Sequence, residues 1–301
     1  MTIRKHLSLL SAVLLGTLSL AGCGGGVLDP AGPVGQQELV ILIDSLAIML
    51  VIVVPTILCT LGFAFWYRAS NTRASYAPRW SYSGRLELLV WSIPALVVCF
   101  LSGIAWTGSH ALDPAQPLSS ERRPLEVQVV SLDWKWLFIY PQEHIASVNE
   151  LVIPAGTPVH FRLTSASVMN VFFVPRLGSE IYTMNGMVTE LNLAADKPGT
   201  FPGLAAHFNG DGFSDMHFKT RAIAPEAFSA WIASTRAAGP QLDETTYREL
   251  LHQSVIPTSY TYRSVASDLF DEITAQHLPQ GEGPRLAELQ QHIHRAAART
   301  R

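Results

Sequence analysis

Two long apolar runs constrain this chain more than any other feature. One extends from Ser45 to Trp66 and the other from Leu86 to Thr107. Each holds about 22 residues, so each would form a helix roughly 33 Å long, enough to cross the hydrocarbon core of a bilayer. Only 15% of all residues are charged, and the mean hydropathy is +0.22. We therefore predict a transmembrane helical hairpin over residues 39–110.

Features inside and beside the runs fit membrane helices. Pro55 and Pro94 fall within them, and membrane helices tolerate proline because neighbouring helices and waters satisfy the freed carbonyls. Aromatic residues that favour the membrane–water interface stand near the run ends: Trp66, Tyr67, Trp80, Tyr82 and Trp106.

The charge on either side of the runs predicts their direction. The loop between them carries Arg68, Arg73, Arg79 and Arg85 and no acidic residue, whereas residues 24–38 contain no Lys or Arg. The positive-inside rule places the loop in the cytoplasm. The N-terminus and the long C-terminal part are then expected on the periplasmic face of a bacterial inner membrane.

The N-terminus has the pattern of an export signal. A basic start at Arg4-Lys5 precedes apolar sequence from Leu7 to Leu20, which predicts a signal peptide over residues 1–22. The quartet that ends in Cys23 resembles the lipobox of bacterial lipoproteins, whose cysteine receives a diacylglycerol. This resemblance implies a lipidated tether over residues 23–38. The alternative is a chance cysteine in an ordinary signal peptide.

The sequence after the second run changes to strand patterns. Residues 125–140 are rich in β-branched and aromatic types. Further short strands are expected at Leu151–Ile153, Val159–Thr164, Val171–Val174 and Val188–Leu193. Pro198-Gly199 and Pro202-Gly203 read as turns that end this region. The pattern predicts an antiparallel Greek-key sandwich over residues 124–224.

Residues 225–301 favour helices instead. Helical spacing occurs at 225–238, 244–252, 267–276 and 285–298. The three cysteines are Cys23, Cys59 and Cys99, so the region after residue 110 has neither a disulfide nor a thiolate metal site. A net charge of −3 gives no polybasic signature, and no nucleic-acid partner is expected.

Several motifs together resemble one family. They are Leu86-Glu87, Val90–Pro94, Asp133–Trp136, Ser167–Asn170, Phe173–Gly178 and Gly210–Met216. With the lipobox and hairpin, they resemble subunit II of the haem-copper oxidases, in its cytochrome bo-type ubiquinol oxidase branch. The resemblance covers nearly the whole mature chain and implies a cupredoxin-like sandwich.

The copper-binding branch of that family holds a dinuclear copper centre in this sandwich. Its ligands are an upstream His and a C-x3-C-x3-H-x2-M pattern. In this chain the His position holds Asn170, the Cys positions hold Ala205 and Asn209, and the second His position holds Phe213, whereas Met216 is retained. A lone methionine cannot hold copper. The resemblance therefore implies a metal-free sandwich.

For the whole complex, the resemblance implies a proton-pumping terminal oxidase that oxidises ubiquinol and reduces oxygen to water. This chain would serve assembly and proton entry and carry no cofactor. Haem b, haem o or a, and copper B would lie in subunit I, with subunits III and IV and membrane lipid as further partners.

Glu87 has two interpretations. From the residues alone, it is a headgroup-facing carboxylate or a partner of Arg85. The family resemblance instead implies the carboxylate at the mouth of the K proton pathway of subunit I.

Four other residues are candidates for a binding role. Trp134 and Trp136 correspond to the aromatic pair near the electron entry point of copper-bearing relatives, or else pack the sandwich. His207 and His217 could form a replacement metal site, although exposed loop histidines are more common.

Two other functions compete with the quinol oxidase subunit. One is an electron-accepting copper subunit of a cytochrome c oxidase, which the missing ligands oppose. The other is a free-standing, membrane-anchored lipoprotein with a cupredoxin-like binding module. It predicts a stable solitary protein, whereas the apolar hairpin suggests partner helices.

Overall fold

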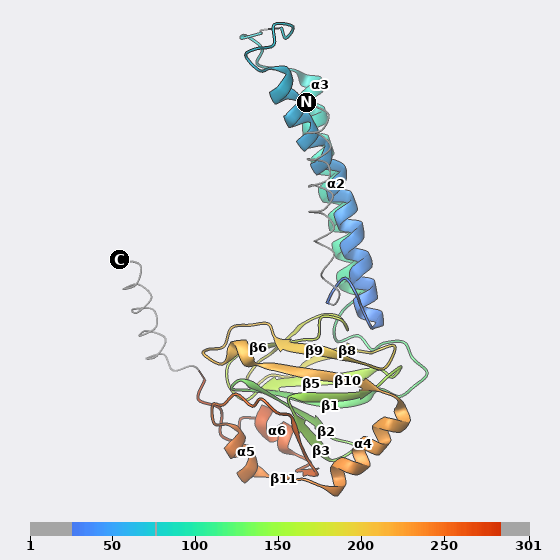
Figure 1. The fold of residues 1–301 in the computed structure, drawn as a ribbon, viewed down its shortest axis with the longest axis vertical. Coiled ribbons are helices and arrows are strands. Elements are labelled where there is room, and N and C mark those ends of the chain that lie inside the picture. Colours follow the sequence, from blue (N-terminus) through green and yellow to red (C-terminus); the bar gives the residue numbers. More distant parts are fainter. Residues whose placement is uncertain (1–25, 76, 284–301) are drawn as a thin grey trace, which may run out of the picture. The chain divides into compact units, whose positions relative to one another are not determined.

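The computed structural model describes residues 26–75 and 77–283 of the 301-residue chain. It divides into two compact units (Figure 1). One is Gln37–Asp113, and the other joins the residues before it to those after it. The signal peptide, Cys23 and the expected helix at 285–298 lie outside the described residues.

The first unit is built from two long helices. Helix α2 spans Pro33–Trp66 and helix α3 spans Gly84–Ala111. Both are long and apolar enough to cross a membrane, and their apolar side chains are mostly exposed, as suits contact with lipid or partner helices. Helix α2 begins well before its apolar run because Pro33 at the first helical position has a φ already suited to a helix.

Side chains within the hairpin limit the number of free polar groups. The hydroxyls of Thr56, Thr60 and Thr107 each donate to a backbone carbonyl four residues earlier, so these three groups are satisfied within their own helices. Gly108 lies close to Ile41, since a Cβ there would come within 2.8 Å of its Cδ1 atom. Small residues permit this kind of close helix contact.

The second unit is a two-layer sandwich. Its larger sheet has six strands in the order β12-β3-β2-β1-β5-β8. Their bounds are β1 Leu125–Leu132, β2 Lys135–Tyr140, β3 Ile145–Val148, β5 Val159–Ser165, β8 Thr189–Leu193 and β12 Tyr260–Tyr262. The predicted hairpin followed by a β-sandwich is therefore confirmed.

The smaller sheet has five strands in the order β4-β10-β9-β6-β7. Their bounds are β4 Glu150–Pro154, β6 Asn170–Phe173, β7 Ile181–Thr183, β9 Gly199–Ala205 and β10 His217–Ile223. The prediction of a purely antiparallel sandwich is wrong, because β1 pairs with β5 and β4 with β10 in parallel. The chain leaves the larger sheet at β4 and returns at β5, so β5 lies beside β1 in the same direction.

Strand β9 runs through sequence that reads as turns. Pro202 stands in β9 opposite Lys219, and its side chain is exposed. Gly203 is required by packing, since a Cβ there would lie 2.2 Å from the ring of Phe218. Because proline and glycine are unusual inside strands, they hid the alternation of buried and exposed side chains in β9.

Aromatic rings fill the space between the sheets. Phe172 of the smaller sheet stacks on Phe218, with ring centroids 5.0 Å apart, and meets Trp136 edge-on at 5.5 Å. Phe138 and Phe161 complete the group. All five rings are buried, so burial of aromatic area dominates the sandwich core.

The C-terminal region packs on the larger sheet as both helices and strands. Its elements are α4 Pro225–Ala237, β11 Gln241–Leu242, α5 Glu244–Leu250, β13 Ser264–Val265 and α6 Leu269–Thr274, with β12 between α5 and β13. The helices at 225–238, 244–252 and 267–276 are confirmed, and three short strands, which the sequence did not predict, accompany them. Tyr260–Tyr262 pairs with β3 because that edge offers unpaired backbone groups.

This region forms a second apolar core on the outer face of the larger sheet. Tyr247, Phe270 and Ile273 pack against Leu132 and Leu137.

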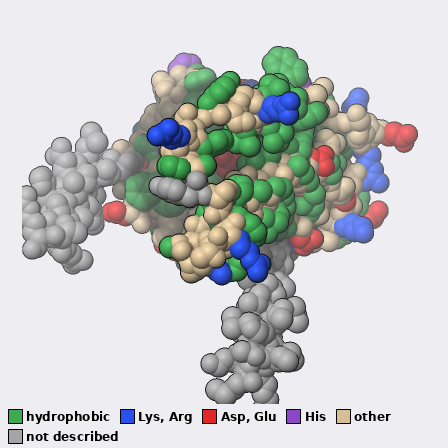
Figure 2. Space-filling model, turned by 90° about the horizontal axis from the view of Figure 1, so that it is seen from above, with side chains coloured by type: hydrophobic (Ala, Val, Ile, Leu, Met, Phe, Trp, Pro, Cys, Tyr) green, Lys and Arg blue, Asp and Glu red, His purple; other side chains and the backbone are tan. Residues whose placement is uncertain are grey.

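On the face drawn in Figure 2, basic and acidic side chains are interspersed around hydrophobic ones.

Candidate functional site

The residues that the family resemblance predicts to replace copper ligands come from three neighbouring segments. Asn170 begins β6, Ala205 ends β9, and Met216 directly precedes β10. Strands β6 and β9 pair through Phe172 and Ala205. This pairing brings the ends of the segments together at one edge of the smaller sheet.

Asn170, Asn209 and Met216 form a buried cluster there, which we call the amide–thioether cluster. The Nδ2 atom of Asn209 donates to the Met216 sulfur at 3.1 Å, and that of Asn170 donates at 3.6 Å. All three side chains are at most 4% exposed. Two amides and one thioether therefore hold three segments together in the absence of charge.

The cluster is incompletely satisfied. The Oδ1 atoms of Asn170 and Asn209 are buried and have no hydrogen-bond partner within the described residues. A thioether is a weak acceptor, and an unpaired buried amide oxygen costs about 1–3 kcal/mol. The cluster therefore depends on the tight packing around it.

The two remaining positions have different environments. Ala205 is buried, and its backbone N–H donates to the Met216 carbonyl at 3.1 Å. Phe213 is half-buried and meets Phe208 edge-on, with centroids 5.5 Å apart. The structure thus brings Asn170, Ala205, Asn209 and Met216 together, while the ring of Phe213 packs beside an exposed aromatic residue.

The donor set of this cluster does not suit a dinuclear copper centre. Such a centre needs bridging thiolates and imidazoles, whereas the cluster offers two neutral amides and one thioether. Across residues 26–75 and 77–283, no group of three or more His, Cys, Asp or Glu side chains is arranged to hold a metal ion. The ring centroids of His207 and Tyr182 are 6.3 Å apart. His217 is exposed at the start of β10.

Trp134 and Trp136 differ in position. Trp136 is fully buried and packs between the sheets. Trp134 sits in the β1–β2 turn with φ +64°, a conformation rarely adopted by bulky residues. Its ring covers Gly212, and its Nε1 donates to the Asn209 carbonyl at 3.4 Å. Trp134 therefore holds the loop that carries the cluster.

Lys135 was not identified by sequence reasoning. It is 1% exposed, and its ammonium donates to the Leu250 carbonyl at 2.8 Å, the His252 carbonyl at 2.6 Å and Ser254 Oγ at 2.7 Å. Burial lowers the pKa of Lys135 to about 8, with the Asp133 carboxylate opposing the shift. In the sequence, the sign of this buried lysine was that Asp133 and Lys135 bring charge into a strand-like stretch.

Asp133 forms the second connection from the same turn. Its Oδ2 atom accepts from the Gly283 N–H at 3.1 Å and from Gln253 Nε2 at 3.4 Å. Gly281 adds a backbone hydrogen bond to the Ala166 carbonyl. The β1–β2 turn therefore joins the sandwich to the segment that leads to residue 283.

Glu87 lies in the first turn of α3 and is exposed. A carboxylate at this end is favoured by the partial positive charge of the helix N-terminus. The structure thus keeps Glu87 accessible to a partner.

Comparison with known proteins defines the class first. Residues 127–223 match the family model described as cytochrome c oxidase subunit II, periplasmic domain. The sandwich therefore corresponds to the periplasmic domain of an oxidase subunit II.

Full-length relatives identify the family. The chain is 46% identical over 279 residues to cytochrome bo(3) ubiquinol oxidase subunit 2 of Pseudomonas aeruginosa, covering 92% of this chain and 82% of the relative. It is 47% identical over 266 residues to ubiquinol oxidase subunit 2 of Acetobacter aceti, covering 88% and 86%. The chain belongs to the ubiquinol oxidase subunit 2 family.

One matching solved structure is more distant in sequence. The periplasmic domain of subunit II of cytochrome oxidase from Bradyrhizobium japonicum matches with a TM-score of 0.36 and 22% identity, covering 44% of this chain and 99% of that domain.

Proposed function

We propose that this chain is subunit II of a proton-pumping terminal oxidase that oxidises ubiquinol and reduces oxygen to water. The observation that carries the proposal is the amide–thioether cluster at the ligand positions of copper-bearing relatives. Neutral amides cannot replace bridging thiolates as an electron-accepting centre. Electrons would then enter from membrane quinol, with haem b, haem o or a, and copper B in subunit I.

The chain itself would act in assembly and proton entry, beside subunits I, III and IV. The exposed apolar faces of α2 and α3 offer contact to partner helices. Glu87 would supply a carboxylate at the entrance of a proton pathway in subunit I. Its exposure at the start of α3 supports this role, because a proton-entry group must reach water.

The proposed topology places the arginine-rich loop in the cytoplasm and the sandwich in the periplasm. Cys23 would carry a diacylglycerol. Mass spectrometry of the purified chain should find a lipid-modified Cys23 as its first residue. An uncut, unmodified N-terminus would contradict this assignment.

The function is tested by purifying a tagged chain from its native membranes in mild detergent. We expect a haem-bearing subunit to co-purify, ubiquinol-dependent oxygen consumption, and one copper ion for every two haem irons. A dinuclear copper centre would raise this ratio to three copper ions per two irons. A solitary chain without haem would support the free-standing lipoprotein instead.

A further inference from the structure

The residues that lead into α2 are bound to the sandwich, and we call Asp29–Gln36 the N-terminal clamp. Its Ala31 N–H donates to the Arg176 carbonyl at 2.7 Å. In return, the Asp196 N–H donates to the Ala31 carbonyl at 2.9 Å. The first turn of α2, residues 33–36, accordingly belongs to the sandwich unit.

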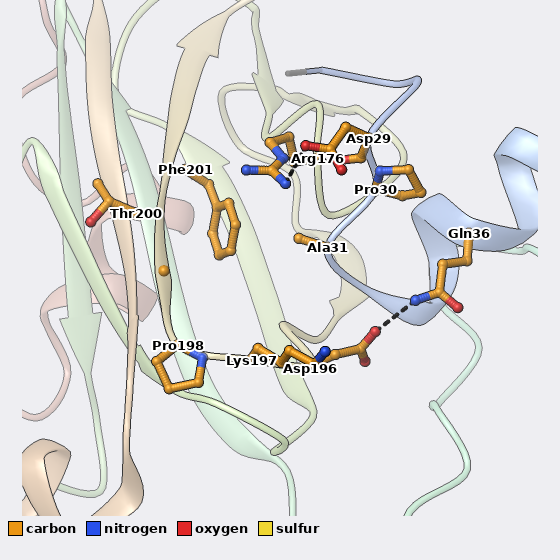
Figure 3. A pocket seen from close by; sticks show the side chains of 11 residues that line it. Asp29, Pro30, Ala31, Gln36, Arg176, Asp196, Lys197, Pro198, Thr200 and Phe201 are labelled. Carbon is orange, nitrogen blue, oxygen red and sulfur yellow. Dashed lines mark hydrogen bonds and ion pairs between the residues drawn. The ribbon is translucent and has the colours of Figure 1, made fainter. Parts of the chain in front are cut away.

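Side chains reinforce the clamp at both of its ends (Figure 3). At one end, Arg176 Nη2 pairs with Asp29 Oδ2 at 2.7 Å, and its Nε donates to the Asp29 carbonyl at 2.8 Å. At the other end, Gln36 Nε2 donates to Asp196 Oδ2 at 2.8 Å. Backbone and side-chain hydrogen bonds together therefore fix the clamp on the sandwich.

The clamp also fits the sandwich closely. A Cβ at Gly32 would lie 2.0 Å from the Ala194 carbonyl oxygen, so any side chain there must displace the backbone. Val34 is 7% exposed, and a Cβ at Gly178 would come within 2.6 Å of its Cγ1 atom. One glycine on each side of the contact thus permits the clamp to lie against the sandwich.

The segment that follows α3 is bound to the same part of the sandwich. The Pro114 carbonyl accepts from the Asn192 N–H at 2.9 Å and from Asn192 Nδ2 at 3.1 Å. Asn192 belongs to β8, the last strand of the larger sheet, and Asp196 follows four positions later. We call residues 192–196 the β8 edge. Its backbone N–H groups at Asn192 and Asp196 bind the two segments that flank the hairpin, which covers groups that an edge strand leaves unpaired.

The spacing of these two attachments suits a pair of packed helices. Four residues of extended chain cover at most about 14 Å, and packed helices lie about 8–10 Å apart, axis to axis. Within the hairpin, α2 and α3 approach each other at Ile41 and Gly108. Ile41 stands five positions after Gln36, and Gly108 stands six positions before Pro114. Both attachments therefore lie within about two helical turns of this contact along the chain.

We propose that the β8 edge is a spacer that keeps the adjoining ends of α2 and α3 paired. The clamp fixes the start of α2, and the Pro114 contact fixes the chain that leaves α3. Because both are held on one strand, each helix end stays at a high effective concentration near the other. The proposal depends only on contacts inside each unit, and it holds with or without the proposed oxidase function.

The test measures how readily the two helix ends meet in the full chain, in its native membranes. Ile41→Cys and Gly108→Cys are introduced together in a chain that carries Cys59→Ala and Cys99→Ala. A mild oxidant is added, and peptide mass spectrometry follows the disulfide between positions 41 and 108. We expect this bond to form readily, since a Cβ at Gly108 would lie 3.6 Å from Ile41 Cγ1, near where a cysteine sulfur would stand.

Gly32→Ala should slow formation of this disulfide about tenfold, because it displaces the clamp and removes hydrogen bonds that together contribute about that factor. Gly62→Ala is the matched control and should leave the rate unchanged, since no described atom comes within 4 Å of a Cβ at Gly62. Gln36→Ala removes one exposed link only and should slow the reaction about threefold.

Near-ultraviolet circular dichroism checks that the sandwich core is intact in each variant. If Gly32→Ala disturbs that core, the result for Gln36→Ala is decisive, because the Gln36 side chain is exposed and its loss leaves the core untouched. An unchanged rate in an intact Gly32→Ala chain or in Gln36→Ala would overturn the proposal. Equal slowing in Gly62→Ala would also overturn it, since the clamp is intact in that variant.

Discussion

Met216 lies at the centre of the amide–thioether cluster. In this chain its sulfur receives hydrogen bonds from Asn170 and Asn209, so three segments still converge on one atom. No charge is buried in this cluster, which avoids the desolvation cost of unpaired ionic groups. The connection is weaker than metal coordination, and the surrounding aromatic core supplies the remaining stability.

Substitution of Met216 tests this role. Met216→Leu keeps the side-chain volume nearly unchanged but leaves two buried amide N–H groups without an acceptor, so we expect a loss of about 2–4 kcal/mol in the free energy of unfolding. Urea unfolding of the full chain in detergent measures it. Met187→Leu, at an exposed methionine, is the control.

A double-mutant cycle identifies the cause. Met216→Leu should cost much less in a chain that already carries Asn170→Leu and Asn209→Leu, because no amide is then left unpaired. An equal cost in both backgrounds would mean that the sulfur contacts contribute nothing.

Lys135 predicts an unusual pH dependence. Its pKa is lowered from 10.5 to about 8, so between these values the unfolded chain binds a proton that the folded chain has released. The free energy of unfolding should therefore rise with pH from about 8. Burial raises the pKa of Tyr140 and Tyr247, which opposes the rise above pH 10.

Lys135→Met provides the comparison. In this variant the free energy of unfolding should not rise between pH 8 and 9.5. At pH 7 it should be about 2–4 kcal/mol lower than in the wild type, since buried carbonyls lose their donor. Lys219→Met serves as the exposed control. Parallel pH profiles in wild type and Lys135→Met would show that another group titrates.

At the scale of elements, strand pairing in the smaller sheet depends on one glycine. Gly203 of β9 faces Phe218 of the neighbouring β10, and Phe218 stacks on Phe172 of β6. Because the ring is enclosed on both sides, it cannot move away from a new methyl group. The close contact of β9 and β10 also places Ala205 and Met216 side by side.

Gly203→Ala should therefore destabilise the sandwich by about 1–3 kcal/mol through overpacking. Thermal unfolding followed by near-ultraviolet circular dichroism measures the change in the aromatic core. Thr200→Ala, at an exposed position of the same strand, should be nearly neutral. If the two variants melt alike, the ring of Phe218 is free to adjust.

At the scale of the whole molecule, the two units have different tasks in the proposed function. In that proposal the sandwich needs no redox group of its own, while the hairpin presents apolar surface and a few polar residues. Among these, Glu87 and Asp44 open the two apolar runs at opposite membrane faces of the proposed topology. Only the cytoplasmic carboxylate would serve proton entry.

Glu87→Ala in the assembled oxidase should slow oxygen reduction about tenfold, a barrier increase of about 1.4 kcal/mol, because a proton donor to the pathway is missing. Oxygen consumption with excess quinol measures the rate, and haem spectra confirm assembly. Asp44→Asn is the control and should keep the full rate. A fully active Glu87→Ala enzyme would remove the proton-entry role.

The sequence by itself determined the hairpin and the sandwich class, and it predicted the changed ligand positions. Apolar runs of membrane length and the identities of Asn170, Ala205, Asn209 and Phe213 are visible without a structure. These features are local or depend on residue type, so pattern and spacing are sufficient to recognise them.

Only the tertiary structure decided how distant segments meet. The parallel pairing of β1 with β5, the addition of β12 to the sheet edge and the burial of Lys135 under α5 all join residues far apart in the chain. Such contacts form because the fold must bury apolar area and satisfy backbone groups at once, and no local pattern encodes that solution.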